Sequence, residues 1–182
     1  MDTGLRILVL LAFASAVFLI LFSGLRIKGA DPAGKPPIAR PAFILAKLAL
    51  TVSFLFLLLR AIQGGAHLGP ARAVVFLCLL IGGTVILILA VIGLGENLRM
   101  GLPKEETALI TTGVYGFSRN PLYFGGFCLL AASVVYAFSW FNVVAAAIAV
   151  ILHHRIVLSE ERYLAGHFAE YAAYRRKVRR YI

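Results

Sequence analysis

Charge and reactive cysteine are both scarce in this chain. Only 14% of the 182 residues are Asp, Glu, Lys or Arg, and only eight are acidic. Soluble domains carry about a quarter charged residues, so this composition excludes an ordinary soluble domain. Cys78 and Cys128 both fall in apolar runs, without a CxxC motif or a His/Cys cluster. We therefore predict buried reduced thiols, with no disulfide framework and no metal.

Motifs for several common chemistries are also missing. The chain has no GxxxxGK or GxGxxG loop, no HExxH zinc motif and no Ser-His-Asp arrangement. His67, His153, His154 and His167 do not form a metal-ligand pattern, and the adjacent pair His153-His154 would point about 100° apart on a helix. We expect that pair to be interfacial.

Long apolar runs dominate instead, since 61% of the residues are hydrophobic. A helix needs about 20 apolar residues to cross about 30 Å of hydrocarbon. Ala14-Ser15-Ala16 resembles a signal-peptide cleavage site, but the first run continues to Phe22, which favours a retained span. The runs predict five membrane helices, at residues 5–24, 43–62, 73–94, 122–137 and 139–158. The fourth is short, and a tight turn at 139–142 joins it to the fifth.

The predicted fold is therefore an all-α, polytopic membrane protein with a single domain over residues 1–182. Residues 1–94 form a three-helix scaffold in this prediction, and residues 95–182 form the functional core.

The net charge of +10 permits either nucleic-acid binding or a membrane topology signal. With five spans, 15 of the 18 cations fall on one side, and the exceptions are Arg6, Arg60 and Arg72. The positive-inside rule makes that side cytoplasmic. We therefore predict a multi-pass inner- or plasma-membrane protein with a cytoplasmic C-terminus and no nucleic-acid partner. The tail cations are expected to lie against anionic lipid headgroups: Arg175, Arg176, Lys177, Arg179 and Arg180.

Residues 111–126, TTGVYGFSRNPLYFGG, lead from a polar loop into the fourth apolar run. Asn120 and Pro121 predict an N-cap and the first residue of a helix. The unpaired N–H groups of such a helix, together with Arg119, could bind an anion, or Arg119 could simply anchor the helix at the headgroups. A second polar segment, RIVLSEERYLAGHFAEYAAY, follows the fifth run with a helical pattern. Both segments are predicted to lie on the cytoplasmic face.

These two segments carry a family resemblance. LITTGVYGFSRNPLYFGG, followed about forty residues later by SEERYLAGHFAEYAAY, resembles the isoprenylcysteine carboxyl methyltransferase and phospholipid methyltransferase family. The resemblance covers roughly residues 93–181. Members of this family are integral membrane enzymes that use S-adenosylmethionine.

The resemblance implies a cytoplasmic S-adenosylmethionine pocket between the loop before the fourth helix and the C-terminal helix. The resemblance also implies that Arg155 would face the substrate. An amine acceptor would need a base, and Glu160 or Glu161 could serve. Carboxylates suit a sulfonium or ammonium group, and a helix N-terminus suits a carboxylate. The implied cofactor-binding residues are Thr107, Ala108, Leu109, Ile110, Tyr115, Arg119, Asn120, Pro121, Leu122, Tyr123, Glu160 and Glu161.

Three departures from the isoprenylcysteine branch weaken the case for a prenylcysteine substrate. Asn120 stands where that branch has histidine, Ser159 where it has another glutamate, and Phe168 replaces a common glycine. The methyl acceptor therefore stays open between a lipidic or prenylated carboxylate molecule and a small thiol or other small molecule. We expect membrane lipids as partners.

Other interpretations remain for the same residues. Arg155 could be a snorkelling span end, and Glu160 and Glu161 could be a solvated helix face. Two other function classes compete with an enzyme: a non-catalytic protein on this scaffold, and a small transporter. A transporter should carry charged residues within its spans and inverted repeats, and neither is visible.

Overall fold

The computed structural model describes residues 4, 35–63, 66–98 and 108–182. In these ranges the regular structure is helical and no strand is present, so the all-α prediction is confirmed for them. The helices are α2 (Arg40–Ile62), α3 (Pro70–Leu94), α4 (Pro121–Tyr136), α5 (Trp140–His167) and α6 (Tyr171–Lys177), with short 3₁₀ turns η1 (Gly95–Asn97) and η2 (Gly113–Gly116).

Three of these helices, α2, α3 and α5, are long and apolar enough to cross a membrane. Helix α4 has 16 residues, which at 1.5 Å per residue is about 24 Å. The first predicted span, 5–24, lies outside the described residues, so the count of five spans stays a prediction. Helix α5 has 28 residues and runs about 42 Å. It therefore carries the predicted fifth span and the acidic pair on one continuous helix that ends at His167.

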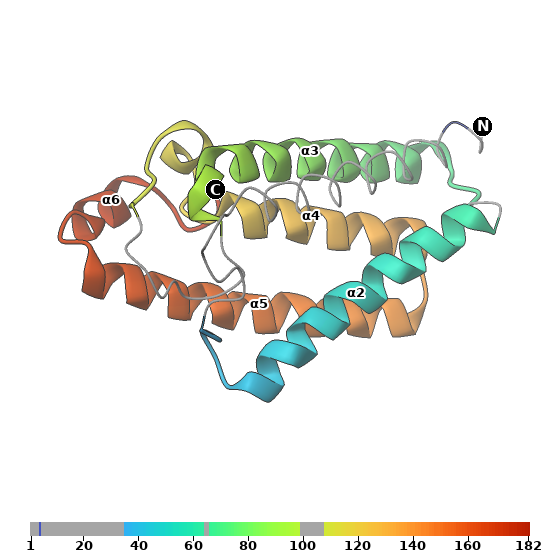
Figure 1. Ribbon diagram of the computed structural model, residues 1–182. Helices are drawn as coiled ribbons and strands as arrows, with labels where there is room; N and C mark the ends of the chain where they lie inside the picture. The colour runs from blue at the N-terminus through green and yellow to red at the C-terminus, as the bar shows by residue number, and fades with distance from the viewer. Residues whose placement is uncertain (1–3, 5–34, 64–65, 99–107) are drawn as a thin grey trace.

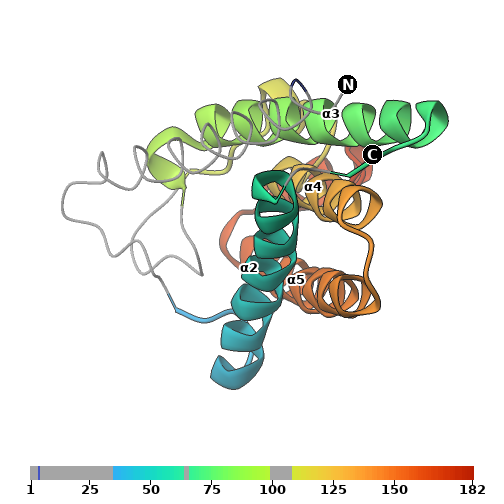
Figure 2. The same cartoon turned by 90° about the vertical axis from the view of Figure 1, so that its right-hand side faces the viewer.

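Helix α4 lies at the centre of the arrangement. Figure 1 shows α4 between α3 and α5, with α2 crossing them obliquely. The quarter-turn view in Figure 2 looks almost along α4 and α5, and α3 crosses above α4 at an angle. Helix α3 packs mainly on α4, and α2 packs mainly on α5. Helix α6 lies near the C-terminal end of α5, so the chain end returns toward the start of α4 (Figure 1).

Glycines allow α3 and α4 to approach closely. A Cβ on Gly125 would lie 2.8 Å from the carbonyl oxygen of Gly83, and a Cβ on Gly83 would lie 2.9 Å from the Cβ of Cys128. Small residues at helix contacts are how membrane helices gain van der Waals packing without a hydrophobic driving force. Nearer the other end of α4, the rings of Phe76 and Tyr136 stack at 4.8 Å between centroids.

A buried polar cluster joins α2, α4 and α5. The Ser53 hydroxyl donates to Asn142 Oδ1 at 2.7 Å, and the Ser133 hydroxyl donates to the Ser53 carbonyl at 2.7 Å. The Asn142 amide donates to the carbonyls of Ser133 and Ala137 at 3.1 and 3.0 Å. All three polar side chains are fully buried. Hydrogen bonds between helices replace those that water cannot supply in an apolar environment, so this cluster fixes the register of the three helices.

Large apolar side chains cover the outside of the helices. In the three long helices, no more than 39% of the most apolar window is buried. Ile92 and Ile151 are 64% and 57% exposed. A continuous apolar exterior of this kind is stable in lipid rather than in water. The structure therefore agrees with a membrane location for this part of the chain.

Candidate active site

The loop before α4 is held by the end of the chain. The backbone N–H groups of Arg119 and Asn120 donate to the carbonyls of Arg179 and Arg180 at 2.9 and 3.1 Å. Ser118 forms an isolated parallel β-bridge with Arg179. Gly113 begins the η2 turn of this loop with φ of 60°, a left-handed conformation that favours glycine. Residues about 60 positions apart thus fix the backbone immediately before α4.

Glu161 of α5 binds the same loop through its side chain. Its Oε1 accepts from Arg119 Nε and Nη2 at 3.1 and 3.0 Å, and from Asn120 Nδ2 at 2.9 Å. Its Oε2 accepts from Arg180 Nε and Nη2 at 3.1 and 3.0 Å. We refer to Arg119, Asn120, Glu161 and Arg180 as the Glu161 clamp. Paired, bidentate contacts of this kind are the strong form of charge-assisted hydrogen bond.

The clamp bears on two expectations. Helix α4 does begin at Pro121, but the Asn120 side chain makes no capping hydrogen bond to the helix. Asn120 is thus the N-cap residue and Pro121 the first helical residue, as predicted, while the Asn120 amide donates to Glu161 and to the Arg180 carbonyl. Arg180 was expected at the lipid headgroups, yet its guanidinium pairs with Glu161. The Arg119 side chain is 7% exposed and is bound by protein groups, including the Val178 carbonyl at 2.6 Å.

Tyr123 and Glu160 form a second link between the predicted motifs. The Tyr123 hydroxyl donates to Glu160 Oε1 at 2.8 Å. Tyr123 lies in the first turn of α4, and Glu160 precedes Glu161 on α5. Among the described residues this is the one hydrogen bond that the Glu160 carboxylate accepts, whereas the Glu161 carboxylate accepts five. Glu160 therefore keeps more capacity to bind another group.

Tyr115 packs inward against α3. Its hydroxyl donates to the Ala90 carbonyl at 3.4 Å, and a Cβ on Gly93 would lie 3.3 Å from its ring. The Tyr174 hydroxyl of α6 donates to the Tyr115 carbonyl at 2.6 Å. These contacts tie the η2 turn to α3 and to α6.

Burial and charge change the acidity of groups around this loop. Burial raises the pKa of Tyr174 to about 12, with a further contribution from neighbouring Tyr171. Burial also raises the pKa of Tyr115, well above its ordinary value, again with help from Tyr174. The hydrogen bonds to Glu161 raise the pKa of Arg180. The tyrosines therefore stay neutral donors and Arg180 stays charged.

The remaining predicted site residues differ in burial. Pro121 is buried, and Leu109, Ile110 and Leu122 are half-buried. Ala108 is exposed, and its N–H donates to Asn97 Oδ1 at 3.2 Å. Thr107 lies outside the described residues.

Arg155 is exposed, and its side chain has no hydrogen bond or ion pair with any described residue. It precedes Glu160 by five positions, which places the two about 140° apart around the axis of α5. Arg155 and the acidic pair therefore belong to different faces of the helix. The predicted cofactor and substrate roles of all these residues stay predictions.

Sequence reasoning missed three residues around the site. Arg180 was counted among the tail cations, His153 was treated as interfacial, and Tyr174 was not named as a site residue. The side chain of His153 is instead buried, with 5% exposure, and its ring centroid lies 6.2 Å from that of Tyr123. In the part of the chain that the structure describes, no group of three or more His, Cys, Asp or Glu side chains could hold a metal ion.

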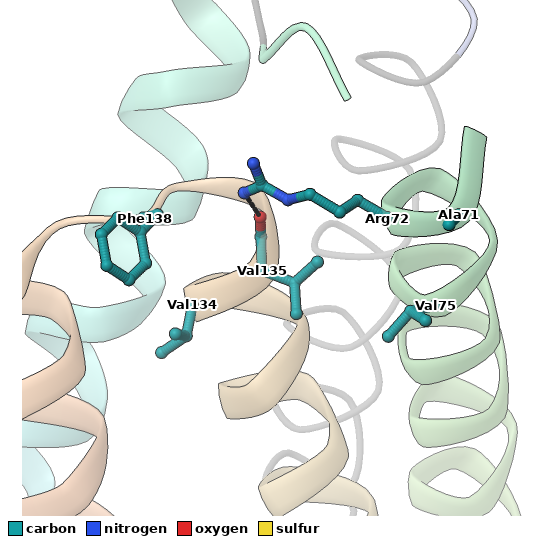
Figure 3. A pocket seen from close by; sticks show the side chains of 6 residues that line it. All are labelled: Ala71, Arg72, Val75, Val134, Val135 and Phe138. Carbon is teal, nitrogen blue, oxygen red and sulfur yellow. Dashed lines mark hydrogen bonds between the residues drawn. The ribbon is translucent and has the colours of Figure 1, made fainter. Parts of the chain in front are cut away.

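A separate hollow of about 530 Å³ lies at the opposite end of α4 (Figure 3). It is lined by Ala71, Arg72, Val75, Val134, Val135 and Phe138. Arg72 Nη2 donates to the Val135 carbonyl at 2.9 Å across it. Because Asn120 and Tyr123 lie at the start of α4, this hollow is not part of the candidate site.

A comparison with protein families identifies the scaffold. The phospholipid methyltransferase family model matches residues 71–171, which is more than half of the chain. The chain belongs to the phospholipid methyltransferase family. A comparison with curated proteins finds no match.

The family match covers α3, the loop before α4, α4 itself and the whole of α5. It therefore includes the Tyr123–Glu160 contact and three of the four clamp residues, and it leaves out Arg180. Membership of the phospholipid methyltransferase family indicates a membrane methyltransferase and confirms the resemblance stated from the two sequence motifs.

Proposed function

We propose that this phospholipid methyltransferase family member transfers a methyl group from S-adenosylmethionine to a lipidic acceptor at the cytoplasmic membrane surface. The observation that supports this most is the meeting of the two sequence motifs. Tyr123 contacts Glu160 at 2.8 Å, and Asn120 contacts Glu161 at 2.9 Å, across about forty positions of sequence. Residues that the family resemblance assigns to one pocket thus lie together.

The acidic pair divides into two roles in this proposal. Both oxygens of Glu161 are engaged by the clamp, so Glu161 is a positioning residue that fixes the loop relative to α5. Glu160 accepts a single hydrogen bond among the described residues, from Tyr123. Glu160 is therefore the carboxylate that can contact a cation or a hydroxyl of a bound molecule.

The residues present fit S-adenosylmethionine. When bound, this cofactor supplies a methyl group on a positively charged sulfur. Glu160 provides the negative charge that suits its sulfonium or ammonium group, and the Tyr123 hydroxyl can hydrogen-bond its polar groups. The backbone of residues 108–110, at the edge of the same loop, would enclose it. The chain's contribution to the rate is mainly positioning and the exclusion of water.

The acceptor is proposed to enter from the bilayer. Leu122 and Phe127 follow Asn120 within two turns of α4 and are only half-buried, so apolar surface begins next to the polar contacts. Arg155 lies on a different face of α5 from Glu160, and we assign it to the anionic headgroup of the acceptor or of a neighbouring lipid rather than to the reacting atoms. A small water-soluble acceptor would not need this apolar border.

Methyl transfer into lipid tests the proposal. Purified protein in vesicles made from a total lipid extract is supplied with methyl-labelled S-adenosylmethionine, and label is measured in the organic phase. We expect labelled lipid from the wild type and from Glu170→Gln, whose carboxylate is exposed. Glu160→Gln should lose at least about tenfold in rate, because removing a charge-assisted contact weakens binding by about 1.5–3 kcal/mol. Label found only in water-soluble products would contradict a lipidic acceptor.

A further inference from the structure

Two hollows adjoin each other at the end of the bundle opposite the candidate active site. The first is the hollow of about 530 Å³ between α3 and α4 shown in Figure 3, and the second has a volume of about 630 Å³. Arg72 and Phe138 line both of them. None of the Glu161 clamp residues lines either hollow, so this region is separate from the candidate active site.

The positive charge at this end is not balanced by the described part of the protein. Arg60 lines the second hollow, and its exposed side chain has no hydrogen bond or ion pair with any described residue. Arg72 uses Nη2 for the Val135 carbonyl at 2.9 Å, which leaves most of its guanidinium N–H donors available. The described acidic residues lie at the other end of the bundle, near the C-terminal ends of α3 and α5: Glu96, Glu160, Glu161 and Glu170.

Membrane topology does not account for these two arginines. The positive-inside rule explains the 15 cations predicted on the cytoplasmic side, and Arg60 and Arg72 are among the three exceptions. Both exceptions that fall in the described residues thus line the same hollow. A paired set of guanidinium groups without a carboxylate partner is suited to a phosphate group.

The start of α3 adds backbone donors at the same place. Helix α3 begins at Pro70, and its N-cap residue Gly69 provides no side-chain cap. The N–H groups of Ala71 and Arg72 therefore have no acceptor within the helix. Because Ala71 and Arg72 both line the first hollow, an anion held there would also be favoured by the N-terminus of α3.

Apolar surface continues from these donors toward the middle of the bundle. Val75 follows Arg72 by one turn of α3, and it is 50% exposed. Val134 lies one turn before Phe138 at the end of α4. Figure 3 shows both valines on the wall of the first hollow, with the Arg72 side chain reaching across its end. A hollow with cations at one end and valines along its wall fits a ligand that has an anionic head and an acyl chain.

We propose that the two adjoining hollows bind a phospholipid with an anionic headgroup, taken from the leaflet that borders this end of the bundle. Arg60 and Arg72 hold the headgroup phosphate in the second hollow, and an acyl chain lies against Val75 and Val134 in the first. The lipid thereby connects α2, α3 and α4. This site does not depend on the proposed methyl transfer.

The only tryptophan of the chain reports on this site. The ring centroid of Trp140 lies 5.6 Å from that of Phe138, which lines both hollows. The full-length protein is placed in phosphatidylcholine vesicles in which a rising share of the lipid is brominated phosphatidylglycerol or brominated phosphatidylcholine. Bromine quenches tryptophan fluorescence on contact, so the two curves give the relative affinity of the two lipids beside Trp140. We expect the wild type to prefer phosphatidylglycerol by at least about fivefold.

Arginine variants test the headgroup contact. Arg60→Gln should lower the preference by about fivefold, and it removes no hydrogen bond to a described residue. Arg72→Gln should lower it as well, but it also removes the link to Val135, so Arg60→Gln is the deciding variant. Arg162→Gln is the control, because Arg162 is an exposed cation near the other end of α5. A preference that is unchanged in Arg60→Gln, or lowered equally in Arg162→Gln, would overturn the site.

Two adjacent valines test the acyl-chain contact. Val75→Phe narrows the first hollow, whereas Val74→Phe adds the same ring at an exposed position that does not line it. We expect only Val75→Phe to lose the preference for phosphatidylglycerol, and equal behaviour of the two variants would overturn the position of the chain.

The same measurement distinguishes a lipid from other occupants. Inorganic phosphate should leave the preference unchanged when it is compared with sodium chloride at equal ionic strength. Loss of the preference in phosphate alone would mean a site for free anions and would overturn the proposal. Protection of Trp140 from both brominated lipids would mean that protein covers this face, and would overturn it too.

Discussion

The Glu161 clamp predicts a specific effect of Glu161→Gln. Glu161 and Arg119 are each 7% exposed at their side chains, and Arg180 is 30% exposed. Breaking a buried ion pair by removing one partner costs about 3–5 kcal/mol. Glutamine keeps one acceptor oxygen for Asn120 or Arg119, and the Arg180 contact is partly screened. We therefore expect a loss of about 2–3 kcal/mol in the attachment of the loop and the chain end to α5.

Amide hydrogen exchange in detergent measures this attachment directly. The N–H groups of Arg119 and Asn120 donate to the carbonyls of Arg179 and Arg180, and they exchange when the chain end detaches. A loss of 2–3 kcal/mol corresponds to faster exchange by about 30- to 150-fold at these two amides. Glu170→Gln is the matched control, because Glu170 is exposed.

The amides within α3 report whether the effect is local. Their exchange should be unchanged in Glu161→Gln, because the Glu161 side chain binds Arg119, Asn120 and Arg180, none of which belongs to α3. Exchange at Arg119 and Asn120 equal to that of the wild type would refute the view that Glu161 holds the loop. Equal acceleration in both glutamate variants would refute it as well.

Three further variants test the packing. Gly125→Ala should lower the thermal midpoint in detergent, because its Cβ would lie 2.8 Å from a carbonyl oxygen of α3, whereas Gly126→Ala meets nothing within 4 Å and should not. Asn142→Leu should also lower the midpoint, because each buried group left unpaired costs about 1–3 kcal/mol of the free energy of unfolding, and an unchanged midpoint would count against the polar cluster. Folding favours the neutral form of Tyr174, so its stabilisation is complete below pH 10 and is lost as the pH rises toward about 12. Alkaline unfolding of Tyr174→Phe should therefore show a smaller pH dependence over that window.

The helices were predictable because their signals are local. The apolar runs placed α2, α3 and α4 within three residues of their observed bounds, and Pro121 marked the start of α4. The continuity of α5 through Glu160 and Glu161 was not predicted, because a change from apolar to polar residues marks the membrane surface and not the end of a helix.

The site was predictable only in part. The resemblance brought Tyr123, Asn120 and the acidic pair to one region, and the structure places them in contact. The clamp required Arg180, whose role depends on a contact with Glu161 across 19 positions that no local pattern reveals. The N-cap position of Asn120 was predictable, but the contact of its side-chain amide with Glu161 was not, because Glu161 comes from another helix. His153 was overlooked because its burial follows from how α2, α4 and α5 pack.

The central claim is that the two motifs form one S-adenosylmethionine site. Isothermal titration of S-adenosylmethionine into the purified protein in phosphatidylcholine nanodiscs tests it most directly, with S-adenosylhomocysteine as competitor. The account predicts saturable binding at one site per chain, displaced by the competitor, unchanged in Glu170→Gln and weakened at least about tenfold in Glu160→Gln. No binding to the wild type, or equal binding to the wild type and Glu160→Gln, would contradict it.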